Sequence, residues 1–165
     1  MTKLGPPDTH HIRAAQGWFE LGNVVEAAVE LNKVRPKFQN ESSVLEMRWA
    51  IEAAAKNWEA CIEIAQTMVK SETNEVAGWL HRSYALHELK RTKEALDLLT
   101  PAVGHFPKVS AIRYNLACYA CQLGDQKEAW NWLKQAIELG NEKEIKLTAL
   151  DDPDLEPLWV DIGDI

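Results

Sequence analysis

The sequence predicts an all-α protein in which one helix–turn–helix unit is repeated four times. Three observations predict this fold: a period of 34 residues, start signals for two helices in three of the four periods, and small or apolar side chains that recur at fixed places. The repeats span residues 8–41, 42–75, 76–109 and 110–143, with no insertion between them. Helix pairs that stack in this way form an α-solenoid.

Three of the four repeats carry two signals for the start of a helix. The residues that open the repeats are Asp8, Ser42, Val76 and Ser110. The sixteenth residues are Asn23, Asn57, Arg91 and Asp125. In both sets, three of the four are favoured N-caps, because their side-chain oxygens accept a free backbone N–H of the first turn. Gly22 and Gly124 stand one place before the second signal, where they suit the end of the first helix.

The interior positions of the repeats agree with this division. The twentieth residues, which we expect where two helices approach closely, are Ala27, Cys61, Ala95 and Ala129. The twenty-fourth residues are Leu31, Ala65, Leu99 and Leu133. The twenty-seventh residues are Val34, Met68, Ala102 and Ala136. Apolar residues at these offsets form one stripe along a helix, so they predict the buried face of the second helix.

Over residues 8–143 the chain resembles the tetratricopeptide repeat (TPR) family, whose 34-residue units follow a W…LG…Y…A…F…P pattern. The third repeat carries Trp79, Ser83, Leu86, Ala95, Leu99 and Pro107 at the pattern's places. The fourth carries Leu116, Ala117, Leu123, Gly124, Ala129 and Ala136, and the first carries Ala15, Trp18, Gly22 and Ala27. The resemblance implies a right-handed superhelix of four repeats.

The second repeat departs from the pattern. The family's phase puts Arg48, Trp49 and Glu52 at core places. The apolar stripe instead runs through Val44, Met47, Ile51, Ala54 and Trp58. We therefore expect its first helix to be rotated, or shifted by one residue. In the third repeat, Pro101 lies inside the second helix, where it removes a hydrogen bond and should kink the helix.

Residues 144–160 are predicted to cap the last repeat. Ile145, Leu147, Ala149 and Leu150 suggest an amphipathic helix. Asp152 and Pro153 then read as the N-cap and first position of a short terminal turn, and Leu155, Leu158 and Trp159 would cover the open apolar face. With this capping helix, residues 1–165 are predicted to form a single domain with short flexible termini.

Composition excludes several classes of function. The net charge is −7, and residues 144–165 contribute −6 of it, so the repeats offer no basic face for nucleic acid. No apolar run approaches the about 18 residues of a membrane span. The N-terminal stretch lacks a secretory signal, and three cysteines form no disulfide framework. We expect a cytoplasmic protein without membrane or nucleic-acid partners.

No catalytic motif is present, so the sequence predicts neither an enzyme nor a cofactor. Cys118 and Cys121 have the CxxC spacing of redox and zinc sites. They lie well inside a helix, however, where a helix N-terminus cannot lower a thiol pKa, and no second pair exists for structural zinc. A metal site of Cys118, Cys121 and His87 is the less favoured alternative, and we predict no metal site.

In the TPR family, the second, fifth, ninth, twelfth and thirteenth residues of each repeat line a concave groove that binds a ligand. On this chain the resemblance implies a partner-binding strip of Gln16, Phe19, Leu80, Tyr84, His87, Tyr114, Cys118, Cys121 and Gln122. Its aromatic and apolar character suits a peptide or helix of a partner protein. The alternative is self-association into a homo-oligomer through a convex ridge of Ile64, Leu98, Trp132 and Trp130.

Overall fold

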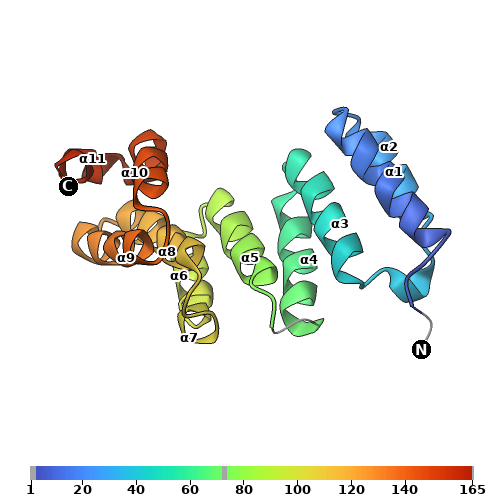
Figure 1. Cartoon of the computed structure of the whole chain (residues 1–165), viewed down its shortest axis with the longest axis horizontal. Coiled ribbons are helices and arrows are strands. Elements are labelled where there is room, and N and C mark those ends of the chain that lie inside the picture. Colours follow the sequence, from blue (N-terminus) through green and yellow to red (C-terminus); the bar gives the residue numbers. More distant parts are fainter. Residues whose placement is uncertain (1–2, 72–73, 165) are drawn as a thin grey trace. The chain divides into compact units, whose positions relative to one another are not determined.

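The structure is a computed structural model that describes residues 3–71 and 74–164, and within these residues it contains helices and turns but no strand (Figure 1). It comprises two compact units, Met1–Ala85 and Leu86–Ile165. Helix α5 (Ala77–Glu88) contributes residues to both units. The prediction of a single domain stays a prediction, and the two units are described separately.

The first unit is built from two helix pairs and the beginning of α5. Helices α1 (Asp8–Glu20) and α2 (Val24–Asn32) form the first pair, and α3 (Ser42–Ala54) and α4 (Trp58–Ser71) form the second. A 3-10 turn, η1 (Pro36–Phe38), joins the pairs. The core of the first pair and its junction with α3 consists of Ala15, Ala27, Leu31, Val34, Phe38, Val44 and Ile51. The helix pairs therefore coincide with the predicted repeats.

The second unit begins at the end of α5 and contains the remaining elements. Its repeat helices are α6 (Thr92–Leu99), α7 (Ala102–His105), α8 (Ser110–Gln122) and α9 (Gln126–Leu139). Its C-terminal segment consists of α10 (Glu142–Asp151), η2 (Pro153–Leu158) and α11 (Trp159–Gly163). The large buried side chains of this unit are Leu86, Leu99, Ile112, Leu116, Leu133, Leu155, Leu158 and Ile162.

Backbone geometry repeats with the sequence period. The fifteenth residues of the four repeats, where each first helix ends, are Gly22, Lys56, Lys90 and Gly124. All four have positive φ, at 79°, 56°, 63° and 86° respectively. A left-handed residue at this place ends a helix and turns the chain into the next one. In the second and third repeats a lysine occupies this place, where its side chain carries a steric cost that glycine would avoid.

The predicted N-caps are confirmed only in part. Asn23 and Asp125 accept hydrogen bonds from the backbone N–H groups of Glu26 and Glu128, and so cap α2 and α9. The first helices of the first, second and fourth repeats instead begin one residue early, so that Asp8, Ser42 and Ser110 are first helical residues rather than caps.

Asp8 has a different role, because it is fully buried and binds Arg35 in the turn after α2. Its carboxylate accepts bonds from Arg35 N at 2.8 Å and from Arg35 Nε at 2.8 Å. This pair ties the start of the first helix to the end of the second.

Other irregularities follow from single residues. Pro101 breaks the second helix of the third repeat, as predicted, because α6 ends at Leu99 and α7 begins at Ala102. Gly78 lies where an added Cβ would come within 2.9 Å of Met68 Cβ, so α4 and α5 approach closely there. In the C-terminal segment Asp152 caps η2 and Pro153 follows it, as predicted. The predicted amphipathic face of α10 is only partly buried, since Leu147 is 60% exposed.

Candidate functional site

A groove of about 470 Å³ lies between α1 and α3 of the first unit. It is lined by Ile12, Gln16, Phe19, Glu20, Ser43, Glu46, Met47 and Ala50. The α1 residues occupy ligand-facing positions of the first repeat, and Ser43, Glu46 and Ala50 occupy the second, fifth and ninth positions of the second repeat. The groove is thus formed by the first helices of two consecutive repeats.

The groove has an apolar floor and a polar rim. Ile12, Phe19 and Met47 are partly buried and pack against the core of the first unit, so that their outer surfaces remain available to a ligand. On the rim, Glu20 and Glu46 are both exposed, and the Glu20 carboxylate accepts a bond from Gln16 Nε2 at 2.9 Å. A floor of this kind suits an apolar anchor, while the rim suits polar contacts beside it.

An aromatic cluster lies where α3 and α4 meet α5 in the first unit. The ring of Trp49 stacks on His81 with ring centroids 4.0 Å apart. Tyr84 meets Trp49 and Trp58 edge-on, at 6.3 Å and 5.7 Å between centroids. Burial lowers the pKa of His81, so its neutral form is favoured in the stack. Tyr84 remains 44% exposed at the edge of the cluster.

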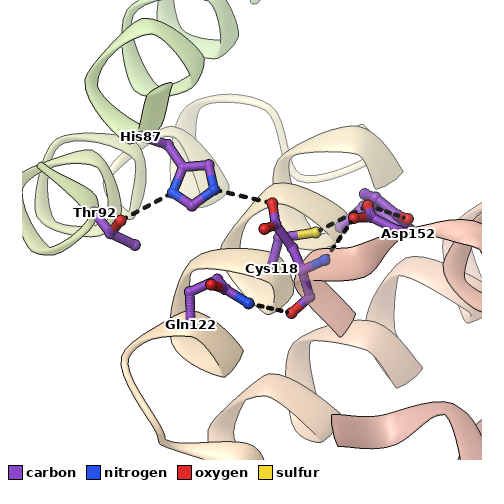
Figure 2. A network of polar contacts seen from close by, with 7 residues as sticks. His87, Thr92, Cys118, Gln122 and Asp152 are labelled. Atoms are coloured by element: carbon purple, nitrogen blue, oxygen red, sulfur yellow. Dashed lines mark hydrogen bonds and ion pairs between the residues drawn. The ribbon is translucent and has the colours of Figure 1, made fainter. Parts of the chain in front are cut away.

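In the second unit, the C-terminal segment lies on α8 and contacts the predicted strip there (Figure 2). Tyr114 donates its hydroxyl to Asp152 Oδ2 at 2.8 Å, and the Cys118 thiol donates to the same oxygen at 3.6 Å. Asp152 Oδ1 accepts from Asp154 N at 3.0 Å, which fixes the start of η2. The Asp152 carboxylate therefore joins α8 to η2.

Three further contacts extend this network, two of them made by His87 of α5 (Figure 2). His87 Nε2 lies 2.9 Å from Asp154 Oδ2, while its Nδ1 lies 2.9 Å from the Thr92 hydroxyl. Gln122 donates its amide to the backbone carbonyl of Asp154 at 3.0 Å. With these bonds, residues 152–154 contact α8 from Tyr114 to Gln122.

Covering by this segment is accompanied by burial, which changes the pKa values of the Cys118 thiol and the Tyr114 hydroxyl. His87, Cys118 and Cys121 are 8%, 5% and 4% exposed. Burial raises the pKa of the Cys118 thiol well above its ordinary value, and the carboxylates of Asp152 and Asp154 raise it further. Burial likewise raises the pKa of Tyr114. Both groups therefore stay protonated near neutral pH and act as hydrogen-bond donors to the segment.

These pKa shifts oppose a redox role for the CxxC pair, because thiol chemistry needs a lowered pKa and access to solvent. The side chains that could hold a metal ion together are Cys118, Asp152 and Asp154, whose ligand atoms lie within 4.8 Å of one another. Within the described residues, Cys121 and His87 do not join this group, so it differs from the alternative set suggested by the sequence. Each of these side chains already has a partner: the Cys118 thiol donates to Asp152, and the Asp154 carboxylate lies 2.9 Å from His87 Nε2.

Two other hollows of the second unit lie beside the covered region. One of about 310 Å³ lies between α8 and α10, where Ala111, Tyr114 and Ile145 contribute to its walls. The other, of about 630 Å³, lies at the turn between α5 and α6 and has a charged wall. Lys90, Arg91 and Lys93 all line it, and Arg91 and Lys93 pair with Glu94 and Asp97 of α6. The charge of this second hollow is therefore compensated in part.

The nine predicted strip residues thus fall into two groups. In the first unit, Gln16 and Phe19 line the groove, and Leu80 and Tyr84 lie on α5. In the second unit, His87, Tyr114, Cys118 and Gln122 contact the chain's own C-terminal segment or the residues beside it, and Cys121 is buried. All four residues of the predicted convex ridge are half-buried: Ile64, Leu98, Trp130 and Trp132.

Sequence reasoning missed the α3 side of the groove and the role of Asp152 and Asp154. The ligand-facing positions of the second repeat would have identified Ser43, Glu46 and Ala50, but the poor fit of that repeat obscured them. In the sequence the two aspartates indicate only a turn and its cap. No spacing of residues in the sequence indicates that these two aspartates contact α8.

The comparisons with known proteins address the fold. No family model matches the chain, and the comparison with curated proteins finds no match either. Among solved structures, MamA residues 41 to the end from Desulfovibrio magneticus RS-1 aligns with a TM-score of 0.74 and 15% identity, over 98% of this chain and 96% of that one.

A thermophilic TPR protein of Thermus thermophilus, TTC0263, aligns with a TM-score of 0.73 and 18% identity, over 94% of this chain and 83% of that one. The chain therefore has the all-α TPR fold, which confirms the fold class predicted from the 34-residue period. In the described part of the chain, none of the helices has the length and apolar character needed to cross a membrane.

Proposed function

We propose that the chain is a protein-interaction scaffold that binds a peptide segment of a partner protein in the groove between α1 and α3. The observation that supports this most strongly is the groove itself, which combines an apolar floor of Ile12, Phe19 and Met47 with open access from solvent. Its position on the first helices of two repeats matches the ligand-facing strip that the sequence pattern implies. Fixed helices provide a preorganised site, which limits the entropy lost on binding.

The proposal extends to the aromatic cluster but not to the α8 face. Tyr84 is exposed and held by Trp49 and Trp58, so it offers a rigid aromatic surface to the same partner. On α8, by contrast, a partner would have to displace residues 152–154 to reach Cys118 or Gln122. The proposed binding surface is therefore the first-unit part of the predicted strip. No catalytic step is proposed for it.

Selection of peptides on the purified full chain tests this function. A library of random dodecapeptides displayed on phage is selected against the wild type, against Ala50→Trp and against Ala111→Trp. Ala50 lines the groove of the first unit, so the indole should fill it and abolish enrichment. Ala111 lines the hollow beside α10 in the second unit, so the same substitution there should leave enrichment unchanged.

Circular dichroism checks that both variants retain the helical content of the wild type. Enrichment that survives Ala50→Trp would contradict the proposed groove. Failure to enrich any peptide on the wild type would contradict peptide binding as the function.

Self-association is a second candidate, favoured by exposed apolar residues on the first unit. Val25 and Val29 lie one turn apart on α2 and are 73% and 45% exposed, and Leu21 nearby in sequence is 78% exposed. Burial of such a patch between copies would be favourable. Sedimentation of the wild type and of Val25→Lys/Val29→Lys tests this: an oligomer that dissociates in the variant supports self-association, and a monomeric wild type contradicts it.

A further inference from the structure

At the same repeat positions, the second unit has side chains that act as hydrogen-bond donors and the first unit has carboxylates. At the fifth position, the fourth repeat has Tyr114 and the second repeat has Glu46. At the thirteenth position, the fourth repeat has Gln122 and the first repeat has Glu20. Tyr114 and Gln122 donate hydrogen bonds, whereas ionised carboxylates only accept them. The unit that presents donors and the unit that presents acceptors should therefore select different ligands.

The second unit shows which segment its donors hold. Tyr114 donates to the carboxylate of Asp152 at 2.8 Å, and Gln122 donates to the backbone carbonyl of Asp154 at 3.0 Å. The side chain of Leu155, next in sequence, is fully buried. The occupant of this surface thus combines acidic side chains with an apolar anchor. It provides an example, within the same chain, of a face whose hydrogen-bond donors hold a segment that supplies acceptors.

In the first unit the same positions present carboxylates beside the apolar floor. Glu46 is exposed, and the described part of the chain gives it no hydrogen bond or ion pair. Glu20 accepts one bond, from Gln16, which leaves further acceptor capacity on its two oxygens. The cationic side chains of these helices do not line the groove, and Arg48 instead donates to Asn32 and Gln39. The negative charge of the rim is therefore left for a ligand.

We propose that the partner segment of the first-unit groove is basic: an apolar side chain that enters the groove, flanked by lysine or arginine residues that contact Glu20 and Glu46. This inference rests on the proposed function and adds the chemistry of the partner. It excludes the acidic C-terminal segment of a second copy as the occupant, because its carboxylates would face Glu20 and Glu46. Complementary charge sets specificity and association rate more than total affinity.

The sequences of the selected dodecapeptides test the inference. Peptides whose enrichment is lost on Ala50→Trp should contain more lysine and arginine than aspartate and glutamate, placed around an aromatic or aliphatic residue. One of them, made synthetically with a fluorescent label, should bind Glu20→Gln/Glu46→Gln about tenfold more weakly than wild type at low salt, as two exposed ion pairs of ordinary strength would give.

The matched control is Glu26→Gln/Glu63→Gln, which removes the same charge from exposed sites on α2 and α4. It should leave the affinity within about twofold of wild type, because screened charges outside the groove contribute little. A synthetic peptide with the sequence of residues 150–160 should not compete with the labelled probe.

The outcomes separate this inference from the proposed function. Groove-dependent peptides that are neutral or acidic, or an affinity equal in both double variants, would overturn the charge inference while leaving peptide binding intact. Competition by the acidic peptide would overturn it in the same way. Absence of any groove-dependent enrichment would overturn both proposals.

Discussion

The repeat positions that line the groove in TPR proteins are open in the first unit of the chain and covered in the second. In the first unit, Phe19 and Met47 form the floor of an open groove. In the second, Cys118 bonds to Asp152, which comes after the last repeat, and both Cys118 and Cys121 are nearly inaccessible. Residues at the same repeat position can therefore have different roles in the two units. The neighbouring part of the chain decides whether a residue at such a position lines an open groove or is covered by the chain itself.

The physical reason for the difference lies in the apolar face that each unit leaves uncovered. A stack of repeats exposes an apolar face at its end. After the fourth repeat, η2 packs on α8 and α9 and buries Leu155 and Leu158 there. Once those anchors are in place, Asp152 and Asp154 fall within reach of Tyr114 and His87. Capping of the core and covering of the α8 face are therefore consequences of the same packing.

Removal of an apolar anchor should have the largest effect, because it destabilises the second unit. Leu155→Ala leaves a cavity at a fully buried site, and we expect a loss of about 2–5 kcal/mol in the free energy of unfolding of the second unit. Urea denaturation followed by circular dichroism measures it. Leu147→Ala is the matched control, because Leu147 is 60% exposed and its loss should change stability by about 0.5 kcal/mol or less. Equal effects would contradict the assigned role of Leu155.

Loss of the two carboxylates should open the covered face without removing the anchors. Asp152→Asn/Asp154→Asn weakens the bonds from Tyr114, His87 and Cys118, worth about 1–3 kcal/mol together. Labelling of Cys118 and Cys121 by a thiol reagent should therefore become roughly tenfold to a hundredfold faster. Mass spectrometry of labelled peptides identifies the site.

The internal reference for this experiment is Cys61, a buried cysteine of the first unit whose pKa is raised to about 11 by burial. Its labelling should not change. Asp151→Asn/Glu156→Gln, at exposed acidic positions of the same segment, controls for the change in local charge. Faster labelling of all three thiols, or equal acceleration in the control, would show that the aspartates do not hold the segment in place.

The first unit should show a different dependence on pH because of Asp8. Hydrogen bonds from Arg35 hold the pKa of this buried carboxyl below its usual value. Its contribution to stability is therefore fully present above the unfolded-state pKa of about 3.9 and is lost as the pH falls through the lower folded-state pKa. Thermal unfolding of the wild type and of Asp8→Asn between pH 2 and 6 measures this contribution.

The variant should be less stable at pH 6 and should converge with the wild type toward pH 2. A constant difference across this range would mean that the charge of Asp8 does not contribute to the fold.

The smallest effect is expected at the left-handed positions that both units share. Lys90→Gly in the second unit removes the steric cost of positive φ but gives the unfolded chain more freedom, so a net gain of about 0.5–1 kcal/mol is expected. Gly124→Lys should lose a similar amount. Denaturation midpoints measure both, and a loss of stability in Lys90→Gly would contradict the steric argument.

Much of the fold was predictable from the sequence because it depends on local signals that recur. The 34-residue period located the helix pairs, Gly22 and Gly124 marked their turns, and Pro101 marked a break. The candidate site was less predictable, because it depends on contacts between distant residues. The bond from Tyr114 to Asp152 joins residues that no periodicity relates. The use of Asp8 as a partner of Arg35, rather than as a cap, has the same origin.

Nuclear magnetic resonance tests the central claim, that the first unit binds a partner while the second is covered by its own segment. A groove-dependent peptide from the selection is titrated into the isotopically labelled full chain of 18.7 kDa. We expect shifts of the backbone resonances of Phe19, Met47 and Ala50, with those of Cys118 and Gln122 unchanged. Shifts confined to Cys118 and Gln122, with none in the groove, would contradict it.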